Sequence, residues 1–159
     1  SELKLQKLVD ESAGLKSVSI LRAWSVSGPH VRNPSSYLFS SLVTQALAGH
    51  ILLSTQAPVF RRYVSVRDSI IMGLANFKGG ELTVLDTGGE LIEARDLAML
   101  IKELVNPTAS LSSNEYTSAD ADNYYSDNSS WLKALTSFSH RPTSLAGQIE
   151  EYTKSLLNN

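Results

Sequence analysis

The sequence of 159 residues contains no cysteine. This absence excludes disulfides, thiol nucleophiles and cysteine-ligated zinc sites. An excess of positive charge is missing as well: 14 Lys and Arg residues face 16 Asp and Glu residues, which gives a net charge of −2 and a pI near 5.9. A general nucleic-acid or anionic-membrane binder needs a positive field, so this balance argues against both kinds of partner.

Long apolar runs are also lacking. None approaches the roughly 18 residues of a membrane span, and no basic segment followed by an apolar one opens the chain as a secretory signal would. The hydrophobic share of 42% and the charged share of 19% are typical of one globular domain rather than a disordered tail or a fibre. We therefore expect a soluble, cytoplasmic domain without a membrane partner.

Strand-like and helix-like patterns alternate along the chain. Alternating, β-branched segments predict strands at 17–22, 51–53, 61–66 and 81–86. Apolar residues spaced by three and four predict helices at 1–12, 35–49, 69–77, 94–104, around 131–135 and at 145–156. Ser35 and Ser36 are expected to cap the second helix, and Asp68 the third. The alternation predicts an α/β fold with at least some parallel pairing.

Two helices have clear apolar faces. The clearest is made by Ala94, Leu97, Ala98, Ile101 and Leu104. The other lies at the start of the chain, where Leu5, Leu8, Val9 and Ser12 share one face. Because the chain opens inside a helix without a cap residue, we expect that further sequence precedes it.

The segment 108–130, here called the acidic segment, has a different composition. It is rich in serine and contains four acidic residues but no lysine or arginine: Glu115, Asp120, Asp122 and Asp127. This composition predicts a loop or an edge segment. The aspartates have the charge to hold calcium, but their spacing lacks the glycine and bidentate glutamate of a calcium loop. A solvated acidic loop is the favoured interpretation, and no metal is expected.

Most motif searches give nothing. The sequence has no Gly-x-Gly-x-x-Gly, no Walker loop, no His-Glu-x-x-His and no Gly-x-Ser-x-Gly. The three histidines are isolated, and only His30 lies in a Gly-Pro loop where a functional role is plausible. These searches single out no catalytic residue.

The arginines at 61, 62 and 67 form the most informative cluster. Arg61 and Arg62 are consecutive on a predicted strand, so their side chains are expected on opposite faces. An arginine at the start of a strand is well placed to bind a phosphate or carboxylate with its fork of N–H groups. The alternative is a surface ion pair with Asp68, Glu81 or Asp86, and spacing alone leaves both interpretations open.

Five segments together resemble one family. They are Leu21-Arg-Ala-Trp-Ser-Val-Ser-Gly-Pro29, Ala46-Leu-Ala-Gly49, Arg61-Arg-Tyr-Val-Ser-Val-Arg-Asp68, Leu82-Thr-Val-Leu-Asp-Thr-Gly88 and the helix 94–104. In order and spacing they are similar to the signatures of extended short-chain dehydrogenase/reductases, the NAD-dependent sugar-nucleotide epimerases and dehydratases. No single motif is very specific, so the resemblance depends on their serial agreement.

The resemblance is to the C-terminal half of such enzymes. It implies the last parallel strands of a Rossmann-like sheet in 1–24 and 81–105, and a small, mostly helical substrate-binding lobe in 25–80 and 106–159. Glu2 looks like the glutamate that follows the family's Tyr-x-x-x-Lys, and neither that motif nor the glycine-rich cofactor turn occurs here. The resemblance thus implies NAD or NADP in a full-length parent, and a chain that by itself binds no cofactor and is inactive.

Candidate site residues follow from the same resemblance. Arg61 matches the arginine that binds the substrate diphosphate, and Ser25 matches an asparagine that contacts substrate. Leu38 and Phe39 fall where the family contacts the nucleotide end of the substrate, and Trp24 where the chain passes the nicotinamide. The implied partner is a small molecule, a nucleotide sugar.

Several departures keep alternatives open. Ser25 replaces the asparagine, Ser27 replaces a tyrosine, and no second phosphate-binding arginine occurs around 113–120. The chain could therefore serve another carbonyl or hydroxyl substrate, or be a non-catalytic binding or scaffold domain. Self-association through the face of Leu5, Leu8 and Val9 and the edge of strand 17–22 is a further expectation, because both would be exposed.

Overall fold

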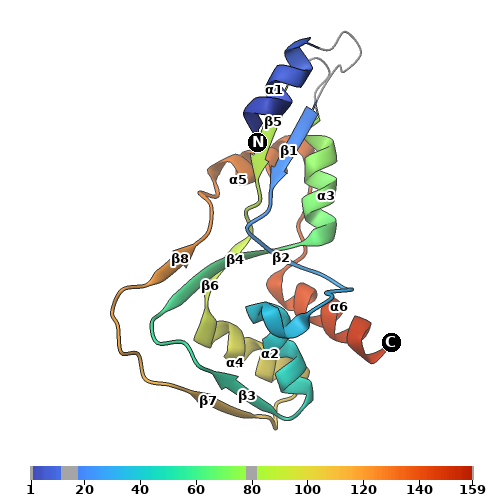
Figure 1. Ribbon diagram of the computed structural model, residues 1–159. Helices are drawn as coiled ribbons and strands as arrows, with labels where there is room; N and C mark the ends of the chain where they lie inside the picture. The colour runs from blue at the N-terminus through green and yellow to red at the C-terminus, as the bar shows by residue number, and fades with distance from the viewer. Residues whose placement is uncertain (1, 12–17, 78–81, 159) are drawn as a thin grey trace.

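The computed structural model describes residues 2–11, 18–77 and 82–158, and strands and helices alternate through it (Figure 1). The helices are α1 (Glu2–Glu11), α2 (Leu38–Leu47), α3 (Val66–Ala75), α4 (Ala94–Val105), α5 (Ser129–Phe138) and α6 (Leu145–Leu157), with a 3₁₀ turn η1 (Pro34–Ser36). The strands are β1 (Val18–Arg22), β2 (Ser25–Ser27), β3 (His50–Leu53), β4 (Val59–Ser65), β5 (Leu82–Asp86), β6 (Glu90–Glu93), β7 (Ser110–Ser113) and β8 (Asp122–Tyr124). The predicted α/β class is confirmed.

Most strand pairs are parallel, as predicted. β1 pairs with β5 and β3 with β7, each in parallel, while β4 pairs in parallel with β2 and β8 and antiparallel with β6. β4 joins the two parts of the molecule: Figure 1 shows β1, β5, α1, α3 and α5 on one side of it, and α2, α4, β3 and β7 on the other.

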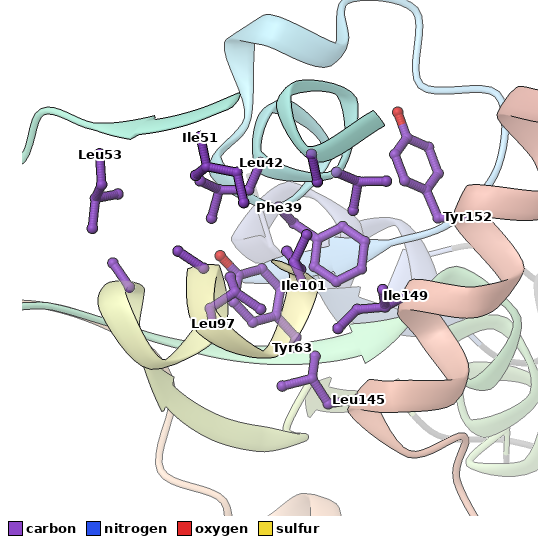
Figure 2. Close-up of a cluster of buried hydrophobic side chains, with 14 residues drawn as sticks. Phe39, Leu42, Ile51, Leu53, Tyr63, Leu97, Ile101, Leu145, Ile149 and Tyr152 are labelled. Carbon is purple, nitrogen blue, oxygen red and sulfur yellow. The ribbon is translucent and has the colours of Figure 1, made fainter. Parts of the chain in front are cut away.

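The larger core lies between α2, α4, α6 and the strands beneath them. Fourteen buried side chains form it, and Figure 2 shows Phe39 and Tyr63 near its centre, Leu97 and Ile149 close by, and Tyr152 at its edge on α6. The rings of Phe39 and Tyr63 lie 5.4 Å apart, and those of Phe39 and Tyr152 5.9 Å apart. The helical face predicted from 94 to 101 is confirmed, but Leu104 is 41% exposed because it lies at the solvent end of α4.

A smaller core covers one face of the β1–β5 pair. It contains Val64, Met72, Leu85, Trp131 and Ala134, contributed by β4, α3, β5 and α5. The β5–β6 turn presses closely on β4 here: Gly89 has φ +121°, and a Cβ atom at this position would lie 2.0 Å from the Tyr63 carbonyl oxygen. A glycine is required at that point.

Two predicted helix starts are wrong. Helix α3 begins at Val66 rather than 69, and its N-cap is Ser65, whose hydroxyl accepts from the Asp68 amide at 3.0 Å. Asp68 is the third residue of the helix, and its carboxylate accepts a hydrogen bond from the Ser65 hydroxyl instead of capping the helix. Ser35 and Ser36 do not cap α2, because they lie in η1 and α2 starts only at Leu38.

The acidic segment is more ordered than a solvated loop. Its residues form β7, β8 and the first residues of α5, and its backbone is hydrogen bonded to Leu53, Gln56 and Pro58. The prediction of an edge segment is confirmed and that of a loop is wrong for these strands. β7 and β8 have only four and three residues, too few for an alternation of apolar and polar side chains to predict a strand. They become recognisable through their pairing with β3 and β4.

The predicted apolar face of the first helix falls only partly within the described residues. Leu5 is partly exposed, whereas the side chains of Leu8 and Val9, and all of Ser12, lie outside the described residues.

Of the helices in the described ranges, none has both the length and the apolar character needed to cross a bilayer.

Candidate functional site

One edge of β4 brings together segments that are far apart in the sequence. Along that edge β8 pairs with residues 59–61, and β2 pairs with residues 63–65. β6 occupies the opposite edge. The end of β8 and the start of β2 therefore meet near the middle of β4, beside Arg61.

Arg61 is held by the acidic segment. Its Nη2 donates to the Asp122 carboxylate at 2.7 Å, and its Nη1 donates to the backbone carbonyls of Asp122 and Phe60 at 3.0 and 2.8 Å. The Arg61 side chain remains 20% exposed. Arg61 thus forms the ion pair that the sequence left open, but its partner is Asp122. Asp68 is bonded to His140 and Asp86 to Trp24, so neither is the partner. Glu81 lies outside the described residues.

Tyr124 contacts both Arg61 and Trp24. It is the register partner of Arg61 in β8, and the guanidinium carbon lies 5.5 Å from the centre of its ring. The Trp24 ring lies 5.0 Å from the Tyr124 ring, tilted by 55°. Arg61 and Trp24, predicted separately, therefore belong to one cluster through a partly exposed tyrosine. A cation next to aromatic faces suits a ligand that combines an anionic group with a ring.

Trp24 is fixed by the ends of β1 and β5. Its indole Nε1 donates to the Asp86 carboxylate at 3.0 Å, and its backbone N–H donates to the Thr87 hydroxyl at 3.0 Å. Asp86 also pairs with Arg22, its register partner, at 3.4 Å. The indole orientation is thus determined by a carboxylate at the carboxyl end of a parallel strand pair.

The other candidates fall in two places. Ser25 is half-buried and lies opposite Tyr63 in the β2–β4 register, directly after Trp24. Leu38 is half-buried against the larger core, and Phe39 is 4% exposed, buried between Tyr63 and Tyr152. The structure therefore groups Ser25 with Trp24 and Arg61, while Leu38 and Phe39 belong to the neighbouring α2.

A cavity of about 440 Å³ borders the loop between β2 and α2. Its lining includes Ser27, His30, Arg32, Tyr37 and the edge of Phe39. His30 has φ +64°, a left-handed conformation that is uncommon for a residue with a Cβ atom. Phe39 thus has two roles in the structure, as a core residue and as one wall of this cavity.

The region where a second phosphate-binding arginine was sought holds a different cluster. Tyr116 donates to the Glu93 carboxylate at 2.7 Å, and the Arg95 guanidinium lies 3.4 Å from the centre of the Tyr116 ring. Arg95 also donates to the Asn114 carbonyl. Desolvation, reinforced by the hydrogen bond to Glu93, raises the pKa of Tyr116 to about 12. This cluster fixes the acidic segment at 114–116, as Arg61 fixes it at 122.

The aspartates considered for calcium have separate partners. Asp122 pairs with Arg61, whereas Asp127 accepts from the backbone N–H of Ser129 at 3.2 Å and from its hydroxyl. Hydrogen bonds from Ser129 hold the pKa of Asp127 below its usual value. Within the described ranges no three His, Cys, Asp or Glu side chains gather as a metal site would require.

Sequence reasoning missed Tyr124, Asp86 and the role of Asp122. The available signal was the pair Tyr124–Tyr125 in a segment that contains no cation of its own. Arg61 lies over one of these rings and Arg62 over the other, each at 5.5 Å, which also fits their predicted opposite faces. Consecutive tyrosines paired with consecutive arginines would have placed this segment beside β4.

The fit of a nicotinamide cofactor can be judged from Trp24. It is the residue that the resemblance places near the nicotinamide, and its two N–H groups are already bonded to Asp86 and Thr87. The chain's sequence has no glycine-rich turn to hold a pyrophosphate. These residues do not make a complete NAD(P) site, so we derive no hydride-transfer step for this chain.

No protein-family model and no curated protein matches the sequence. Solved structures do match the fold. The UDP-glucose 4-epimerase of Thermotoga maritima, solved with UDP-glucose, is 22% identical with a TM-score of 0.74, over 99% of this chain and 50% of that one. A GDP-L-fucose synthetase from Naegleria fowleri is 14% identical with a TM-score of 0.76, over 99% of this chain and 50% of that one. The dTDP-glucose 4,6-dehydratase of Bacillus anthracis, solved with NAD, is 16% identical with a TM-score of 0.67, over 99% of this chain and 50% of that one.

The chain spans about half the length of the solved structures it matches. At these identities the likeness establishes the fold, and the resemblance read from the sequence motifs is confirmed at that level. The chain has the α/β fold of the C-terminal half of the extended short-chain dehydrogenase/reductases, the fold of NAD-dependent epimerases and dehydratases.

Proposed function

We propose that this chain is the substrate-binding half of an NAD(P)-dependent epimerase or dehydratase that acts on a nucleotide-diphosphate sugar. In this proposal Arg61 binds the diphosphate, and Ser25 and Trp24 lie beside the sugar and the nicotinamide. Leu38 and Phe39 contact the nucleotide end. The cofactor and the proton-transferring Tyr-x-x-x-Lys belong to a full-length parent, so the chain alone is expected to be inactive and to bind no NAD(P).

The cluster of Arg61, Tyr124 and Trp24 supports this proposal most directly. Two residues singled out by separate motifs both contact one tyrosine ring. A guanidinium can bind a phosphate with two parallel hydrogen bonds, and aromatic faces accept a sugar or a base. Ser25 follows Trp24 in the same strand edge, which adds a hydroxyl to the cluster.

A second candidate function follows from the Arg61–Asp122 ion pair. Because Asp122 neutralises the one arginine matched to the diphosphate, a substrate without phosphate becomes a reasonable alternative. The same fold would then act on another carbonyl or hydroxyl compound, and Arg61 would serve to hold the acidic segment. A non-catalytic scaffold is the third interpretation, and it predicts no small-molecule binding at the cluster.

Calorimetric titration with UDP, GDP and dTDP distinguishes these functions. A nucleoside diphosphate should bind the wild-type chain, and Arg61→Ala should weaken binding by about 10- to 100-fold, the loss expected for charge-assisted hydrogen bonds. Arg67→Ala is the matched control, since Arg67 is an exposed arginine on α3. Arg61→Lys, which keeps the charge without the fork, should fall between them.

The opposite result is equally clear. If Arg61→Ala lowers the melting temperature but leaves nucleotide binding unchanged, Arg61 is a structural clamp and the diphosphate role is wrong. If no nucleotide binds the wild-type chain or an Asp122→Asn variant, the nucleotide-sugar function is overturned in favour of the alternatives.

A further inference from the structure

We propose that Asp122 is a specificity-determining residue that competes with the substrate diphosphate for Arg61. This inference rests on the proposed function, because it assumes that Arg61 binds a phosphate. It adds a residue to the site that neither the motifs nor the fold comparison assigns. In the resemblance, segment 113–120 was expected to supply a second cation; here the neighbouring Asp122 supplies an anion instead.

The geometry places the Asp122 carboxylate where an anionic ligand would lie. Its Oδ2 accepts from Arg61 Nη2 at 2.7 Å, and its backbone carbonyl accepts from Nη1 at 3.0 Å. Asp122 therefore contacts both terminal nitrogens, the pair that a bidentate phosphate uses. A diphosphate that binds there has to displace the carboxylate or approach from the remaining N–H groups.

The Asp122 backbone is paired with β4, whereas its carboxylate is exposed to solvent and held by the ion pair with Arg61. Its amide donates to the Pro58 carbonyl at 2.8 Å, and residues 122–124 pair with β4. The Asp122 side chain is nevertheless 55% exposed. The carboxylate can thus rotate into solvent without unpairing β8, so displacement by a ligand needs no rearrangement of the fold.

The negative charge of Asp122 is not offset by a cation of its own segment, so it repels anionic ligands. The acidic segment carries Asp120 and Glu115 near it in sequence and contains no cation. Arg62 lies over Tyr125 and donates to the Ser126 and Gly89 carbonyls, so its guanidinium is engaged with other groups. A ligand with more negative charge is therefore repelled more strongly. Only a ligand that displaces the Asp122 carboxylate and binds Arg61 in its place compensates for this repulsion.

The decisive experiment titrates uridine, UDP-glucose and UDP against wild type and Asp122→Asn. The amide removes the charge but is nearly the same size. UDP affinity should rise about fivefold, which is the scale of an exposed ion pair, and UDP-glucose affinity should rise less. Any uridine affinity should stay unchanged. Asp120→Asn is the matched control: it removes the same charge from a residue that does not pair with Arg61, and it should have a smaller effect.

A double-mutant cycle separates the mechanism from a general charge effect. In an Arg61→Ala background Asp122→Asn should no longer tighten UDP binding. Equal tightening by Asp120→Asn and Asp122→Asn, or tightening that survives Arg61→Ala, would overturn the inference. So would an unchanged or weaker UDP affinity in Asp122→Asn when Arg61→Ala still weakens binding, and in that case the proposed function stands. If neither substitution alters UDP binding, the proposed function itself fails.

Discussion

The two parts of the molecule that meet at β4 differ in how well they cover their apolar surface. Around α2, α4 and α6 the larger core encloses fourteen buried side chains. Around β1 and β5 the smaller core encloses five, and the apolar face of α3 beside it stays open. Ile70 and Leu74 of α3, and Phe77 just beyond the end of the helix, are more than half exposed.

This difference indicates that the part around α2, α4 and α6 is stabilised by its own core, whereas the part around β1 and β5 leaves apolar surface for another element to cover. The larger core draws on three helices and two strand pairs, and its most exposed apolar side chains, such as Leu52, Met99 and Leu157, are spread over separate elements. Among the described residues each strand of the β1–β5 pair has one neighbour, so its remaining edge can accept another strand. Ile70 and Leu74 lie four residues apart on α3, and Phe77, which follows the end of the helix, lines the same surface hollow. Exposed apolar side chains gathered in this way are typical of a surface that another element covers.

The largest effect should come from the larger core. Leu97 is fully buried, and Leu97→Ala should lower the free energy of unfolding by about 2–5 kcal/mol. Leu74→Ala removes the same atoms from a side chain that is 71% exposed, and should change it by less than about 0.5 kcal/mol. Urea unfolding of both variants measures the contrast, and equal losses would show that the two parts do not differ.

The next effect concerns the connection between α3 and the loop that follows α5. Asp68 is buried and accepts from the Ser65 hydroxyl, the Thr143 amide and His140 at 2.6, 2.9 and 2.8 Å. Asp68→Asn should lower the free energy of unfolding by about 1.5–3 kcal/mol at pH 7, because hydrogen bonds to a charged group are lost.

The pH dependence of that loss has a definite sign. Burial raises the pKa of Asp68, but the hydrogen bonds from Ser65, Thr143 and His140 outweigh it and leave the pKa below its usual value. A carboxylate with a lowered pKa stabilises the fold above its unfolded value of about 3.9, and this contribution disappears as the pH falls through the folded-state pKa. The difference between wild type and Asp68→Asn should therefore shrink below about pH 4. A difference that is constant down to pH 3 would contradict this assignment.

The open surface should promote self-association. We expect the wild-type chain to form dimers or larger species at micromolar concentrations, and Leu74→Glu to shift the equilibrium toward monomer because it places a charge in the apolar face. Light scattering over a dilution series measures this. A wild-type chain that is monomeric throughout would remove the argument for a covered surface.

The smallest effect is expected at Tyr116. Tyr116→Phe removes its hydrogen bond to Glu93 but keeps the ring beneath Arg95, so the cost should be about 0.5–1.5 kcal/mol. In the wild type this phenol should ionise only near pH 12. An absorbance titration in which Tyr116→Phe loses amplitude near pH 12 would confirm the assignment, whereas amplitude lost near pH 10, the ordinary pKa of tyrosine, would contradict it.

The sequence predicted the elements with strong periodicity and missed those defined by their partners. The face of Ala94, Leu97, Ala98 and Ile101 was readable because its spacing matches one helix turn. β2 and β8 have three residues each, too few to show alternation, and β6 follows the β5 turn without a signal of its own. Ser65 was overlooked as a cap because it also ends a strand.

The candidate site was predicted in the same uneven way. Arg61 and Trp24 were found because the motifs carry them, but their common neighbour Tyr124 comes from the acidic segment. Its position depends on β8 pairing with β4, a contact across more than sixty residues of chain. Long-range pairing of this kind leaves little local trace, so Asp122 was considered for calcium rather than for Arg61.

The most direct test of the site uses the chain's two tryptophans. Trp24 belongs to the Arg61–Tyr124 cluster, whereas Trp131 is buried in the smaller core. In a two-dimensional nitrogen–proton NMR spectrum titrated with UDP, the indole N–H signal of Trp24 should shift and that of Trp131 should stay in place, and Arg61→Ala should abolish the shift. A Trp24 signal that is unmoved at saturating UDP, or a shift that persists in Arg61→Ala, would contradict the assignment of this cluster as the nucleotide site.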